Sequence, residues 1–333
     1  MKTKWAAACA LGGAAVWAGM AVLARIGVAR IGAVELLFLF APLVIVPLGI
    51  ELGRVLGGGG SPLEVARRVQ PLGAACALVA IWLPPGRTAA SFAIGWLVVC
   101  VLIAGSGLVD LIRPPWTTAG RGTRTTWIVT SIARMDLAVG GAWLVASRLG
   151  MRPMGIQEPI GLLTAVHFHF AGFATATIGA ATLRFAEKSR EQKWLQWLIL
   201  IVAVLPVVVA AGFVISPALK MGAAVSFSAG VALFAIVLRA QGRKAQDAMA
   251  RVLLQVAAGA IFAGMVLSGA YAVADYLGSE ALTIPEMART HGILNAVGFC
   301  LPGLLGWLVE NSACTVVTDQ SSFQTEVERE PVH

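Results

Sequence analysis

The chain has 333 residues, of which 58% are apolar and 13% are charged, and its mean hydropathy is +0.82. Soluble domains carry about 25% charged residues and must cover their surface with polar groups, so this composition excludes a water-soluble globule and predicts a protein that faces lipid. The formal net charge of +8 does not indicate a nucleic-acid site, because the basic residues lie in short connectors between apolar runs, where they orient membrane proteins.

Ten apolar runs are long enough, or nearly long enough, to cross a bilayer, since a core of about 30 Å takes about 20 helical residues. The first run follows a basic start and exceeds the roughly 7–15 apolar residues of a signal peptide, so we expect a retained helix. The third run is the weakest, because it is short and ends at Pro84. The runs cover residues 5–24, 32–50, 69–84, 88–111, 127–147, 159–183, 194–215, 219–239, 250–274 and 284–309.

These runs predict an all-α fold, a polytopic transmembrane helix bundle over residues 1–310. The polar tail over residues 311–333 lacks apolar periodicity, so we expect disorder there. If the N-terminus is cytoplasmic, the cytoplasmic segments hold 17 of the 25 basic residues and the outer segments hold seven, with Arg134 left inside a span. The positive-inside rule then places both termini in the cytoplasm.

Three of the four histidines lie in or at the edge of these runs, where an ionisable side chain costs about 3 kcal/mol or more. His167, His169 and His291 all fall roughly 10–15 Å below the outer surface at 1.5 Å per residue, so we expect them at a shared depth. Positions two residues apart point about 200° apart on a regular helix, and His167 and His169 therefore do not ligate one metal together. We expect one to face the bundle interior and the other to pack between helices with a hydrogen-bond partner.

His291 and Asn295 are spaced i,i+4, which puts them on one face of a helix. Glu35 is the acid most favoured to join them, because five apolar residues follow it without a polar break. Glu158 and Glu286 begin their runs and are expected to be solvated at the interface. Acids and imidazoles at one depth favour proton transfer. The alternative is that the histidines are buried, hydrogen-bonded residues that hold helices together.

Arg134 and Asp136 lie within the fifth run, toward its cytoplasmic end. Because they face opposite sides of a helix, each needs a partner on another span or water. A structural charge network between helices and a contact of Arg134 with a substrate anion are both open interpretations. Tyr271 lies one turn deeper than Asp275 on the ninth run. We take Arg134, Asp136 and Tyr271 as candidate substrate-binding residues.

Three segments carry a resemblance to a known family: ELLFLFAPLVIVPLGIEL (35–52), HFHFAGF (167–173) and THGILNAVGF (290–299). Together they resemble the YndJ-like family of bacterial polytopic membrane proteins, over roughly residues 30–310. The resemblance implies a multi-pass protein of the bacterial inner membrane, and it supplies no reaction. The candidate catalytic positions it supports are Glu35, His167, His169, His291 and Asn295.

Three functions compete. The first is an intramembrane enzyme that acts by acid–base chemistry on a lipophilic small molecule, with Glu35 or His291 as proton donor, His167 or His169 as base and Asn295 as orienting group. The second is a proton-coupled transporter. The third is a haem- or metal-binding membrane protein, although no second histidine or carboxylate stands at helical ligand spacing and the five cysteines form no CxxC pair. The expected partners are the lipid bilayer and a lipophilic small molecule, with no nucleic acid, while the sequence leaves cofactor and metal undecided.

Overall fold

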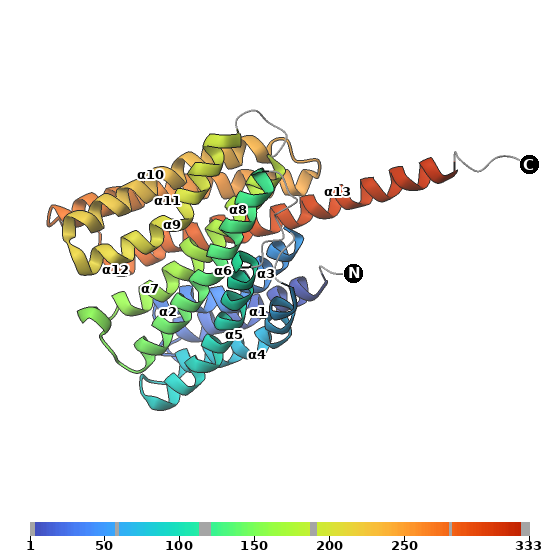
Figure 1. Ribbon diagram of the computed structural model, residues 1–333. Coiled ribbons are helices and arrows are strands. Elements are labelled where there is room, and N and C mark those ends of the chain that lie inside the picture. The colour runs from blue at the N-terminus through green and yellow to red at the C-terminus, as the bar shows by residue number, and fades with distance from the viewer. Residues whose placement is uncertain (1–3, 57–59, 113–120, 187–191, 280–281, 328–333) are drawn as a thin grey trace, which may run out of the picture.

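The computed structural model describes residues 4–56, 60–112, 121–186, 192–279 and 282–327, and in these ranges all regular structure is helical (Figure 1). The all-α prediction is therefore confirmed. In chain order the elements are α1 (Lys4–Arg25), α2 (Ala33–Phe40), η1 (Ala41–Ile45), α3 (Val46–Val55), α4 (Gly60–Trp82), α5 (Arg87–Ile112), α6 (Arg121–Arg148), η3 (Pro153–Gly155), α7 (Ile160–His167), η4 (Phe168–Ala174), α8 (Thr175–Phe185), α9 (Gln192–Ile215), α10 (Pro217–Gly242), α11 (Ala248–Tyr276), α12 (Ile284–Met287), η5 (Ala288–Gly292), η6 (Leu294–Cys300) and α13 (Leu301–Val327).

Each of the ten apolar runs corresponds to a helical span. Among the described residues, nine spans are long and apolar enough to cross a membrane. The tenth is α4, the run that the sequence marks as weakest. Its first turns carry the charged residues Glu64, Arg67 and Arg68 and the buried Gln70, which lowers its apolar character without ending the helix.

Two spans form the interior of the bundle. The most apolar window of Ala33–Val55 is 83% buried and that of Ile160–Phe185 is 72% buried, against 17% for Lys4–Arg25 and 28% for Lys193–Ile215. Helix α10 packs against both α9 and α11, and α5 packs against both α4 and α6. Figure 1 shows α9, α10 and α11 on one side of the molecule and α4 and α5 on the other, with α6, α7 and α8 between them.

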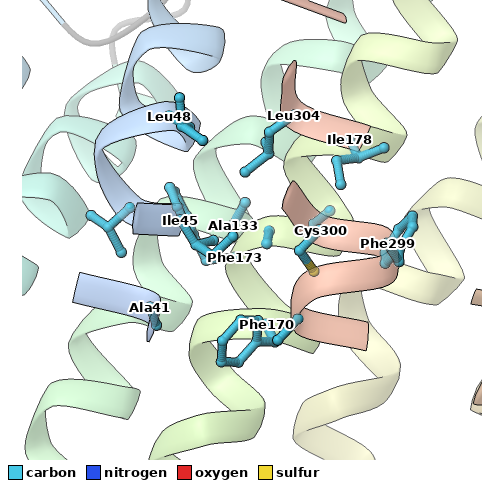
Figure 2. Close-up of a cluster of buried hydrophobic side chains, with 14 of the residues drawn as sticks. Ala41, Ile45, Leu48, Ala133, Phe170, Phe173, Ile178, Phe299, Cys300 and Leu304 are labelled. Atoms are coloured by element: carbon cyan, nitrogen blue, oxygen red, sulfur yellow. The ribbon is translucent and has the colours of Figure 1, made fainter. Parts of the chain in front are cut away.

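Three spans are interrupted by π-helical segments: η1 in the second, η4 in the sixth, and η5 with η6 in the last. Segments η1 and η4 contact each other, and η4 contacts η6. The side chains of all three meet in a buried hydrophobic cluster that includes Ile45, Phe173 and Phe299 (Figure 2). Single-turn π-segments are rare and are frequent at functional sites, so their meeting point directs attention to this level of the bundle.

Side chains complete the hydrogen bonding of two π-segments. The buried Gln70 on α4 donates from Nε2 to the carbonyl oxygen of Pro42 in η1 at 2.7 Å, and Thr175 donates from Oγ1 to the carbonyl oxygen of Phe170 in η4 at 2.9 Å. An unpaired backbone group inside a membrane protein costs several kcal/mol because lipid offers no partner. The polar residue Gln70 is buried within a span because the carbonyl oxygen of Pro42 requires a hydrogen-bond donor there.

Helix α13 continues through residues 311–327, a segment for which the sequence predicts disorder. Figure 1 shows this part projecting away from the bundle. A physical reason is that extending an existing helix adds one hydrogen bond per residue without a new nucleation step. Residues 328–333 of the predicted tail lie outside the described residues.

The Gln70–Pro42 hydrogen bond yields a stability prediction. We expect Gln70→Leu to lower the free energy of unfolding by about 1–3 kcal/mol, because it leaves a buried carbonyl oxygen without a donor. Thermal unfolding of the purified protein in detergent measures the change. Gln157→Leu, at an exposed position before α7, is the matched control, and equal stability of the two variants would contradict the assignment.

Candidate functional site

A cavity of about 820 Å³ lies among α6, α7, η4, α9, α10, α11 and the start of the last span. Most of its lining is apolar. His167 and His291 both line it, and each is the seventh residue after the first residue of its helix, Ile160 or Ile284. At 1.5 Å per residue both histidines lie about 10 Å from the start of their spans. The remaining polar lining residues are Thr164, Thr175, Lys220, Ser268, Tyr271, Asp275 and Asn295.

His167 exposes its side chain to this cavity. Its Nδ1 lies 2.7 Å from the carbonyl oxygen of Leu163. Because a carbonyl oxygen only accepts hydrogen bonds, Nδ1 is the donor, and in the neutral imidazole the lone pair is then on Nε2. Within the described residues Nε2 has no hydrogen-bond partner.

His169 points away from the cavity and is fully buried. Its Nδ1 donates to the carbonyl oxygen of Ala165 at 2.7 Å, and its Nε2 accepts from Nε1 of Trp96 at 3.0 Å. The ring also stacks on Trp96 and meets Phe38 edge-on, with centroids 5.2 Å apart. The two-residue spacing thus separates His167 from His169 as predicted. Both ring nitrogens of His169 are occupied, and the hydrogen bond with Trp96 joins α5 to η4.

His291 and Asn295 form the pair that their spacing predicts. Nδ1 of His291 donates to the carbonyl oxygen of Gly264 on α11 at 2.9 Å, and Nε2 accepts from Nδ2 of Asn295 at 2.8 Å. The Oδ1 atom of Asn295 is buried without a hydrogen-bond partner. It packs against Gly264, where an added Cβ would lie only 2.9 Å from it. Glycine at this position therefore allows the last span to approach α11 closely enough for both hydrogen bonds.

The structure does not bring Glu35 to the cavity. Its Oε2 accepts from the backbone N–H of Gly32 at 3.1 Å, at the start of α2. Glu286 likewise accepts from the N–H of Thr283 at 2.7 Å, and Glu158 accepts from the N–H of Leu162. Carboxylates stabilise helix N-termini, where backbone N–H groups lack partners. The Thr283-x-x-Glu286 spacing is a capping signal that the sequence shows.

Arg134 pairs with a residue of another span. Its Nη1 lies 2.6 Å from Oδ2 of Asp110 on α5, and its side chain is 3% exposed. Neither residue lines the cavity. Sequence reasoning required such a partner without finding Asp110, which stands at the end of its apolar run and carries no signal of burial.

Asp136 lies on the opposite face of α6 and is 4% exposed. Its Oδ2 has no hydrogen-bond partner within the described residues. It packs against η4 at Gly172, where an added Cβ would lie 2.6 Å from this oxygen. Burying an unpaired carboxyl group within the membrane costs free energy. The close approach of Asp136 to η4 requires glycine at position 172, because any larger side chain would clash with the carboxyl group.

Lys220 is a cavity residue that sequence reasoning missed. Its Nζ lies 2.7 Å from Oδ2 of Asp275 and 5.1 Å from the ring centroid of Phe213. Tyr271, a predicted site residue, also lines the cavity and lies within electrostatic range of both charges. The positive-inside count treats Lys220 only as a loop charge, so its pairing across α10 and α11 requires the three-dimensional structure.

No group of three or more His, Cys, Asp or Glu side chains in the described ranges is arranged to hold a metal ion. His167 and His291 therefore lack a third ligand of these types nearby, and metal sites in proteins commonly use three or four.

The helical spans define a multi-pass integral membrane protein. The chain belongs to the YndJ-like protein family, which it matches over residues 36–299. It is 29% identical over 177 residues to the "Uncharacterized membrane protein YndJ" of Bacillus subtilis (strain 168), a match that covers 53% of this chain and 32% of that protein. The chain thus aligns with less than two thirds of its relative's length. No solved structure matches it. The family resemblance seen in the sequence is confirmed.

The Arg134–Asp110 ion pair yields a second stability prediction. We expect Arg134→Met to lower the free energy of unfolding by about 3–5 kcal/mol, because it leaves the carboxylate of Asp110 buried without its cation. The double variant with Asp110→Leu removes both charges and should recover most of that loss. Thermal unfolding in detergent measures both, and a double variant as unstable as the single one would contradict a structural ion pair.

Proposed function

We propose that the chain is an intramembrane enzyme that acts by acid–base chemistry on a lipophilic small molecule, with His167 as the base. One observation carries the proposal: of the three histidines in the spans, only His167 has a ring nitrogen without a partner, and that nitrogen belongs to a side chain lining the cavity. Imidazole is the side chain best suited to take up and return a proton near neutral pH.

The surroundings of His167 support this role. The hydrogen bond to Leu163 fixes the tautomer and holds the ring in one orientation, which is the function of the orienting group behind a catalytic histidine. The apolar walls suit a lipophilic molecule, since binding sites for small molecules combine an apolar lining with a few fixed polar groups.

His291 and Asn295 take a positioning role in this proposal. Both nitrogens of His291 are engaged with Gly264 and Asn295, so the imidazole is held neutral and its orientation is fixed. Both residues line the same cavity as His167 and add polar groups to its mostly apolar lining. Glu35, a proton donor in the sequence-based hypothesis, has no part here because it caps α2 outside the cavity.

A proton-coupled transporter is the second candidate, and Asp136 is the observation that favours it. The buried carboxyl group without a partner packs against η4 five residues after His167, at Gly172. Five helical residues correspond to about 7 Å, so a proton acceptor would stand deeper in the membrane than the histidine. Flux into proteoliposomes that depends on pH and is lost in Asp136→Asn would favour transport over catalysis.

The test of the enzyme proposal replaces His167 with an uncharged residue of similar polarity. We expect His167→Gln to reduce conversion of a bacterial lipid extract by about 10²–10⁴-fold, the usual contribution of general acid–base catalysis, while thermal stability stays near that of the parent. Mass spectrometry of the extract before and after incubation with purified protein measures conversion.

His333→Gln makes the same chemical change at the end of the chain and serves as the matched control. It should convert the extract at the parent rate. Conversion by His167→Gln at the parent rate would overturn the assignment of the base, and no conversion by the parent would overturn the enzyme proposal.

A further inference from the structure

The outer end of the cavity carries one cation and one anion in direct contact. Lys220 lies in the first turn of α10 and Asp275 in the last turn of α11, with Nζ and Oδ2 2.7 Å apart and side chains 27% and 37% exposed. Both residues line the cavity. A molecule that enters the cavity can therefore reach both charged groups. Before it enters, the charges of Lys220 and Asp275 already neutralise each other.

Glu286 and Arg289, near the start of the last span, are a second pair of opposite charges that interact with each other. Neither lines the cavity, whereas Ile284 and Met287 of the same span do. Tyr271 adds a hydroxyl group one turn below Asp275. An anionic group placed at this end would gain Lys220 but face Asp275 at nearly the same distance, so its net attraction is small.

The two polar ends of the cavity are well separated. Gly264, which accepts the hydrogen bond of His291, and Asp275 stand eleven residues apart on the continuous helix α11. At 1.5 Å per residue this is about 16 Å. Apolar lining residues such as Met265, Phe227 and Val231 occupy the stretch between these ends.

We propose that the cavity binds an amphiphile whose polar head is uncharged or zwitterionic, with the head at Lys220 and Asp275 and the apolar body extending toward His167. A group with both donors and acceptors complements a paired cation and anion, whereas a purely anionic head leaves Asp275 unfavourably placed. The inference rests on the proposed function in that it names the class of molecule the same cavity takes.

The test measures head-group preference by binding. The purified protein is mixed in detergent with equal amounts of lysophosphatidylethanolamine, lysophosphatidylglycerol and monoacylglycerol that carry the same acyl chain, which are zwitterionic, anionic and neutral. Native mass spectrometry counts the molecules bound. We expect the zwitterionic and neutral probes to exceed the anionic one.

Asp275→Asn should raise the ratio of anionic to zwitterionic probe roughly tenfold, because it leaves Lys220 without its counter-charge. Lys220→Gln should lower the same ratio, which gives a second readout if one variant does not fold. Asp275→Glu keeps the charge and should behave like the parent. The matched control is Glu64→Gln, which removes one negative charge, as Asp275→Asn does. Glu64 lies in the first turns of α4, outside the cavity lining.

Preference of the parent for the anionic probe, an unchanged ratio in Asp275→Asn and Lys220→Gln, or no binding of any probe would overturn the inference. The acid–base proposal fails separately: His167→Gln should retain the head-group preference while losing conversion. A loss of conversion without the expected preference would leave His167 as base and remove only the assignment of the head group.

Discussion

A polar group inside a membrane protein must find its partner within the protein, because the hydrocarbon core offers none. This constraint explains the contacts that hold the interior spans together. Gln70 donates a hydrogen bond to the backbone of η1, Trp96 donates one to His169, and Asp110 forms an ion pair with Arg134. In each case the two groups come from different helices, so satisfying a polar group also fixes how two spans pack.

The few atoms that escape this constraint are informative for the same reason. Nε2 of His167 and Oδ2 of Asp136 lack partners: His167 directly precedes η4, and Asp136 packs against η4 at Gly172, about 7 Å further along the helix. Segment η4 also contacts η1 and η6, so the three spans that contain π-segments meet beside the cavity. Oδ1 of Asn295, in η6, is also buried without a partner, so three unpaired polar atoms lie in or beside π-segments.

Hydropathy and spacing predicted much of this architecture. All ten runs are helical, and nine of these spans in the described residues are long and apolar enough to cross a membrane. The i,i+4 spacing of His291 and Asn295 predicts the hydrogen bond that joins them. The π-segments could not be predicted in this way, because one extra residue in a helical turn leaves an apolar run apolar. Glu35 illustrates a second limit. An acid ahead of an apolar run is a plausible site residue by sequence, but in the structure Glu35 accepts a hydrogen bond from the backbone N–H of Gly32 at the start of α2. Asp110 and Lys220 were out of reach because their partners are distant in sequence.

The hydrogen bond between Trp96 and His169 has a mechanical consequence for the cavity. It fastens α5 to η4 on the side formed by the interior spans, where burial is greatest. The wall formed by α9 differs, because this helix lines the cavity with apolar side chains such as Val207, Phe213 and Val214. A hydrogen bond weakens as its geometry departs from linear, whereas apolar contact has no preferred direction. Trp96 therefore sets the rotation of η4 about its own axis, two residues from His167, in a way that the apolar contacts of α9 do not.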